Sequence, residues 1–71
     1  MKTYLRKNEI KKILIRKNQS QNWLASRIQI SSGYICQLLN GSRNPSPKIR
    51  ERIMNNLPEY SFDDLFEIRS K

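Results

Sequence analysis

The chain has 71 residues, of which fourteen are Lys or Arg and six are Asp or Glu, and its formal net charge at pH 7 is +8. A chain of this length makes one small domain and buries only about 60% of the surface of its unfolded state. With one cysteine and no histidine, a disulfide framework and a Cys/His zinc site are excluded.

The sequence also argues against an enzyme and against a membrane protein. No nucleophile stands at a useful spacing from a base, and there is no phosphate-binding loop, so we expect no catalytic residue, cofactor or metal. The basic first residues are not followed by an unbroken apolar run, which argues against a signal peptide or a membrane span. The lone thiol, Cys36, fits a reducing compartment, and we expect a soluble, cytoplasmic protein.

Charge is distributed unevenly along the chain. Residues 1–20 carry seven basic residues and one acid, residues 21–50 carry four basic residues and no acid, and residues 51–71 carry five acids and three bases. A basic first two-thirds with an acidic end predicts one face for a polyanion and another face for a different contact.

Residues 5–17 are predicted to form the first helix, because Ile10, Ile13 and Leu14 recur at helical spacing on one face. Basic side chains surround this stripe, so a membrane-surface helix is the alternative. The stripe is narrow and lacks a large aromatic residue, which favours packing within a bundle.

Two short helices, over about 21–28 and 32–39, are predicted to flank a sharp corner at residues 29–31. Ser20 and Ser31 are expected to cap them, and Gly41 is expected to end the second in the left-handed conformation. The inward-facing residues recur at helical spacing; they are Leu24, Ala25 and Ile28, followed by Ile35, Leu38 and Leu39.

The outward face of the helix over 32–39 carries no charge. Its residues are small or bear amides; they are Ser32, Gly33, Cys36, Gln37 and Asn40. Such side chains suit base edges in a DNA major groove, where Gln pairs with adenine and Ser donates or accepts. An ordinary solvated helix is the alternative, but such faces usually carry Lys and Glu, so we favour a contact surface.

A turn over residues 41–45 leads into the next helix. Ser46 and Pro47 mark its start, Ile49, Ile53 and Leu57 form its buried stripe, and Pro58 ends it.

A last short helix is predicted over residues 62–68, capped by Ser61. Around it lies a dense apolar group, consisting of Tyr60, Phe62, Leu65 and Phe66. Two interpretations stay open: these side chains complete the core alone, or they also form a dimer contact.

The stretch from Gln21 to Gly41 resembles the helix-turn-helix of the lambda repressor/Cro-type (XRE-like) DNA-binding family, found in phage and mobile-element regulators. The resemblance covers nearly the whole chain. It depends on matches at fixed spacing, which are Gln21, Leu24-Ala25, Ile30, Ile35, Leu38, Asn40-Gly41, Arg43, Pro45-Ser46-Pro47, Ile49, Ile53 and Leu57. It implies an all-α, five-helix domain over residues 1–71, with the helix-turn-helix at 21–40 and a dimerisation segment at 57–69.

The resemblance also implies roles for individual residues. Base-reading positions map onto Ser32, Gly33 and Gln37. Contacts to the DNA backbone are expected from Gln21, Ser31, Tyr34, Arg43, Asn44 and Lys48. The dimer contact would come from Tyr60, Phe62 and Phe66. The implied partners are double-stranded DNA and a second copy of the chain, with a protein co-regulator as a further candidate and no membrane.

Three departures from the family pattern stand out. The usual apolar residue just before the helix over 21–28 is Gln19 here. Many relatives have Gly at the corner where this chain has Gln29; a positive φ there would cost about 1 kcal/mol relative to Gly. Many relatives also pair an Arg with a Glu where this chain has Leu14 and Leu39. Because an apolar pair replaces ion pairs at little or no cost, we predict that these two leucines touch.

Two hypotheses of function follow. The first is a sequence-specific transcriptional regulator, a phage or mobile-element repressor that binds operators as a dimer. The second is a protein-interaction module, antitoxin-like or a co-regulator, that keeps the fold but acts through a protein partner.

Overall fold

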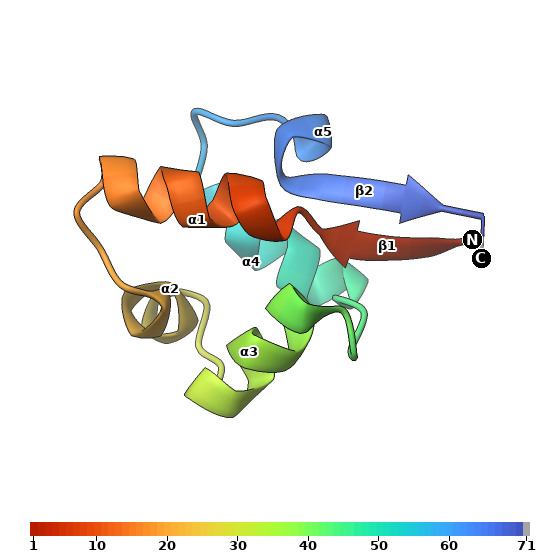
Figure 1. Cartoon of the computed structure of the whole chain (residues 1–71), viewed down its shortest axis with the longest axis horizontal. Coiled ribbons are helices and arrows are strands. Elements are labelled where there is room, and N and C mark those ends of the chain that lie inside the picture. Colours follow the sequence, from red (N-terminus) through yellow and green to blue (C-terminus); the bar gives the residue numbers. More distant parts are fainter. Residues whose placement is uncertain (71) are drawn as a thin grey trace.

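The two ends of the chain pair with each other. In the computed structural model, which describes residues 1–70, β1 (Lys2–Leu5) and β2 (Phe66–Arg69) form an antiparallel two-stranded sheet. The register places Leu5 opposite Phe66 and Lys2 opposite Arg69. Figure 1 shows the two strands side by side at one end of the molecule.

This sheet corrects the predicted all-α fold. The first helix does not begin at residue 5, and the last helix does not reach residue 68, because both segments are strands there. The strand residues Thr3, Tyr4, Phe66 and Ile68 are β-branched or aromatic, which suits a pleated surface. A four-residue strand carries too short a pattern to be told from a helix end by periodicity.

Five helices lie between the strands within the described residues. They are α1 (Lys7–Arg16), α2 (Gln21–Arg27), α3 (Ser32–Asn40), α4 (Pro47–Asn56) and α5 (Phe62–Leu65). In Figure 1, α2 and α3 lie together at the lower edge and α1 crosses above them. The protein is therefore mostly helical, with a small terminal sheet.

Serine side chains start four of these helices, as predicted. Each hydroxyl accepts a hydrogen bond from the backbone N–H three residues later, which satisfies a donor that has no partner within the helix. The four caps are Ser20, Ser31, Ser46 and Ser61. At Ser61 the exchange is reciprocal, because the carboxylate of Asp64 accepts from the Ser61 N–H at 3.0 Å.

Three residues in the left-handed conformation follow helices. Gly41 ends α3 at φ 84°, and Gln29 follows α2 at φ 62°, as the resemblance suggested. Asn18 follows α1 in the same left-handed conformation, at φ 56°, and this was not predicted. After α2, the Ile30 N–H donates to the Ala25 carbonyl at 2.9 Å, which closes the helix end in the manner of a Schellman motif.

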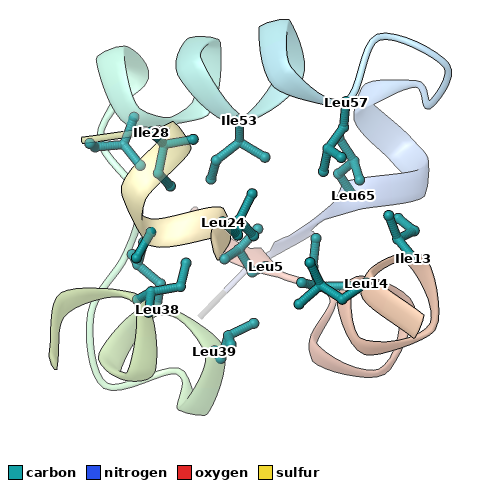
Figure 2. Close-up of a cluster of buried hydrophobic side chains, with 14 of the residues drawn as sticks. Leu5, Ile13, Leu14, Leu24, Ile28, Leu38, Leu39, Ile53, Leu57 and Leu65 are labelled. Atoms are coloured by element: carbon teal, nitrogen blue, oxygen red, sulfur yellow. The ribbon is translucent and has the colours of Figure 1, made fainter. Parts of the chain in front are cut away.

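The core is made entirely of apolar side chains from both strands and all five helices. Figure 2 draws fourteen of these side chains, ten of them labelled, between the ribbons. The predicted stripes of the helices are buried; these residues are Ile10, Ile13, Leu14, Leu24, Ala25, Ile28, Ile35, Leu38, Leu39, Ile49, Ile53 and Leu57. Leu14 and Leu39 belong to the same buried cluster, each 6% exposed. Their direct contact stays a prediction.

Among residues 1–70, no helix is both long enough and apolar enough to cross a membrane.

Candidate nucleic-acid interface

The outward face of α3 is open to solvent. The three predicted base-reading residues of this helix are exposed, and so are Cys36 and Asn40; the three are Ser32, Gly33 and Gln37. The opposite face supplies three leucine or isoleucine residues to the core, which fixes the rotation of the helix about its axis. No acidic residue stands on α3, so nothing on the helix itself repels a polyanion.

The amino-terminal end of α3 is tightly organised. The Ser31 hydroxyl accepts from the Tyr34 N–H at 3.1 Å, and Tyr34 itself is half-buried against the core. A methyl group added at Gly33 would come no closer than 4.0 Å to the Ser31 hydroxyl oxygen. The local fold therefore does not require glycine at position 33, although its lack of a side chain leaves the backbone free to approach a large ligand.

Three predicted site residues form one cluster on this face. Arg43 donates from Nε to the Gln37 side-chain oxygen at 2.9 Å, and its guanidinium carbon lies 5.0 Å from the centre of the Tyr34 ring. From the sequence, Tyr34, Gln37 and Arg43 are expected only as separate contacts to DNA. Their six- and nine-residue spacings across the turn at Gly41 carry no periodic signal that would have paired them.

The loop after α3 is held at several points. The Ser42 N–H donates to the Asn40 side-chain oxygen at 2.9 Å, and the Arg43 N–H donates to the Gln37 carbonyl at 3.3 Å. The Asn44 amide donates to the Thr3 carbonyl of β1 at 2.9 Å. One of the two N–H donors of the Asn44 amide is thus used in the terminal sheet, and the second is still a donor that a phosphate could accept from.

The two remaining backbone-contact candidates lie at helix starts. Gln21 is half-buried at the first position of α2, and Lys48 is exposed at the second position of α4, directly after Pro47. No carboxylate of residues 1–70 lies within 4.0 Å of the Lys48 or Arg43 side-chain nitrogens. Both cations are therefore available to an anionic ligand.

The ion pairs of the described chain lie outside residues 21–50; they are Lys12–Glu9, Lys17–Glu59 and Arg69–Glu67. A hydrogen bond from the Lys17 ammonium lowers the pKa of Glu59. A hydrogen bond from Arg69 lowers the pKa of Glu67, and Glu67 in turn raises the pKa of Arg69. Three acids thus pair with cations outside this region, and residues 21–50 carry four basic residues and no acid.

The predicted dimer residues occupy unequal positions. Phe66 is 1% exposed and belongs to the core of the single chain, whereas Tyr60 and Phe62 are half-buried at its edge. The rings of Phe62 and Phe66 pack with their centres 4.9 Å apart. Ile68 of β2 is 57% exposed and was not among the predicted contact residues.

Comparison of the chain with protein-family models, with curated proteins and with solved structures gives no match.

Proposed function

We propose that this protein is a sequence-specific regulator of transcription that binds double-stranded DNA through a helix-turn-helix formed by α2 and α3. The observation that carries the proposal is the exposed, uncharged face of α3 within residues 21–50, a range that includes the cations Arg43 and Lys48 and no acid. A neutral, hydrogen-bonding helix face suits base edges, and flanking cations suit phosphates.

In this proposal α3 lies in the major groove, where Ser32 and Gln37 present hydroxyl and amide groups to the bases. Lys48 neutralises a phosphate, and Gln21 lies at the start of α2 close to the backbone. Two copies bind half-sites about one helical turn apart, roughly 34 Å, with Tyr60 and Phe62 at the dimer contact. Bound at a promoter, such a dimer blocks polymerase, which is the action of a repressor.

Selection of bound duplexes from a random pool, followed by titration of the enriched sequence at several salt concentrations, tests the proposal. We expect a defined two-fold site and an affinity that falls steeply with salt. Lys48→Ala should weaken binding to all duplexes alike and reduce the salt slope by about one. Lys11→Ala, which removes an exposed cation of α1, is the matched control and should leave both nearly unchanged. Equal binding to every duplex would contradict the proposal.

Exposed apolar side chains favour a second candidate function, a module that acts through a protein partner. Ile15 and Ile68 are 74% and 57% exposed. Singly scattered apolar residues are common on protein surfaces, so the DNA regulator remains our conclusion. If the chain captures a stoichiometric protein partner and selects no duplex sequence, the protein-partner module becomes the favoured function.

A further inference from the structure

The Arg43 guanidinium is directed toward the middle of the α3 face. The family resemblance predicts that Arg43, in the loop after α3, contacts the DNA backbone. The hydrogen bond from Nε to the Gln37 oxygen, at 2.9 Å, instead brings the guanidinium beside a proposed base-reading side chain. We infer that Arg43 reads a guanine in the major groove, with Gln37 and Tyr34 as its positioning residues. This inference rests on the proposed function.

The hydrogen-bond inventory supports this assignment. A guanidinium carries five N–H donors and no acceptor. Gln37 engages the one on Nε. The terminal nitrogens of Arg43 make no hydrogen bond to any residue of the described chain, so their four N–H groups stay available. Guanine is the base that offers two acceptors, N7 and O6, on its major-groove edge, and a guanidinium contacts both at once.

Two contacts limit the freedom of the Arg43 side chain before DNA arrives. Its cation lies over the Tyr34 ring, 5.0 Å from the ring centre, and Tyr34 is itself half-buried against the core. The Gln37 hydrogen bond holds the Nε edge of the same guanidinium. A donor group that is already oriented loses less conformational entropy on binding, which favours a specific base contact over a diffuse phosphate contact.

The same geometry changes the role of Gln37. Arginine only donates, so the Gln37 atom facing it must be the oxygen, and the amide nitrogen must point the other way. Gln37 therefore presents N–H donors to the groove while its oxygen supports Arg43. The target base next to the guanine is then one with an acceptor at its major-groove edge.

The test compares specificity rather than affinity alone. Wild-type protein and the variants Arg43→Ala, Arg43→Lys and Lys48→Ala are each titrated with the selected duplex and with duplexes changed at every position of one half-site. A further duplex carries 7-deazaguanine, which lacks the N7 acceptor. Thermal unfolding of each variant shows that it folds, as expected for substitutions at exposed positions.

We expect wild type to discriminate against loss of one guanine by about 5-fold to 150-fold, the range for a bidentate contact. Arg43→Ala should abolish that discrimination at this one position, and 7-deazaguanine there should weaken wild type but not Arg43→Ala. Arg43→Lys should retain the salt slope and lose most of the guanine preference, because an ammonium lacks the planar fork.

An equal loss of affinity of Arg43→Ala for all duplexes, with a salt slope lower by about one and every base preference retained, would overturn the inference and leave the proposed function standing. Absence of any base preference in the wild-type protein would overturn both.

Discussion

The side-chain amide of Asn44 donates a hydrogen bond of 2.9 Å to the backbone carbonyl of Thr3, joining the loop after α3 to the first strand. On the neighbouring turn, the Tyr4 ring lies 3.9 Å from the position that a side chain at Gly41 would occupy. The first strand, β1, therefore supports the loop that carries Arg43, although Asn44 and Thr3 are 41 residues apart in sequence.

Asn44→Ala should lower the free energy of unfolding by about 1 kcal/mol, the usual net value of one hydrogen bond, and should weaken DNA binding because the loop loses its support. Urea denaturation and duplex titration measure the two effects. Asn55→Ala is the matched control, since Asn55 is exposed on α4; it should leave DNA binding unchanged and should not lower the free energy of unfolding, because alanine favours a helix. Unaltered stability of Asn44→Ala would show that the hydrogen bond is not maintained in solution.

Gln29, at the corner between α2 and α3, has a left-handed backbone conformation, and one substitution there should change the stability of the protein in a predictable direction. Gln29→Gly should raise the free energy of unfolding by about 0.5 to 1 kcal/mol, because the relief of steric strain at φ 62° exceeds the greater entropy of glycine in the unfolded chain. Asn18→Gly should raise the free energy of unfolding by less, since asparagine tolerates the left-handed conformation better than glutamine does. Urea denaturation midpoints give the comparison.

Gln19→Gly is the control for this pair, because Gln19 does not have a positive φ. It should lower the free energy of unfolding, since only the entropic penalty of glycine applies there. A Gln29→Gly variant that is less stable than the wild type would show that the corner is not strained.

The ion pair between Lys17 and Glu59 predicts a pH dependence. The Lys17 ammonium nitrogen lies 2.7 Å from a carboxylate oxygen of Glu59 and lowers the pKa of Glu59 below its ordinary value of 4.5. The unfolded state then takes up the proton first as the pH falls. The contribution to stability is thus present above pH 4.5 and is lost as the pH drops through the lowered pKa.

Lys17→Met should therefore be less stable than wild type at neutral pH, and the difference should shrink as the pH falls below 4.5. Added salt should shrink it too, because the pair is partly exposed. Chemical denaturation at a series of pH values measures the effect. Glu51→Gln serves as the control, because no ion pair joins Glu51 to another residue of 1–70. A pH-independent difference would contradict the assignment.

The helices were predictable because their signals are local. Leu24 and Ile28, four residues apart, define a buried face, and Ser20 and Ser46 mark helix starts by a hydrogen bond to a backbone three residues away. The exposure of Gln37 followed from the same periodicity, since the buried stripe of α3 fixes the residues that point outward.

The strands were not predictable, because their pairing is a contact between the two ends of the chain. Phe66 and Ile68 follow Leu65 at spacings that continue a helical pattern as well as they fit a strand. The segment is a strand and not a helix because it pairs with β1, where Phe66 lies opposite Leu5. The Arg43–Gln37 contact was missed for a different reason, because the two residues lie six apart across the turn at Gly41 and this spacing has no periodic signal.

Substitutions at Phe62 and Phe66 should distinguish side chains that stabilise the fold from side chains that join two copies of the chain. Phe66 is 1% exposed, so Phe66→Ala should lower the free energy of unfolding by about 3 to 5 kcal/mol. This is a large part of the roughly 4 to 10 kcal/mol typical of a chain of this length. Phe66→Leu keeps most of the buried volume and should remain folded with a loss of about 1 kcal/mol.

Phe62→Ala and Tyr60→Ala remove half-buried side chains at the edge of the core. In the proposed dimer they should weaken self-association on DNA more than they reduce stability, whereas Phe66→Leu should do the reverse. Sedimentation of each variant with a duplex carrying one or two half-sites separates these effects, because a dimer contact strengthens binding only to the paired half-sites. Cooperative binding that survives in both Phe62→Ala and Tyr60→Ala would place the contact between copies elsewhere, and the exposed Ile68 of β2 is then the next side chain to replace.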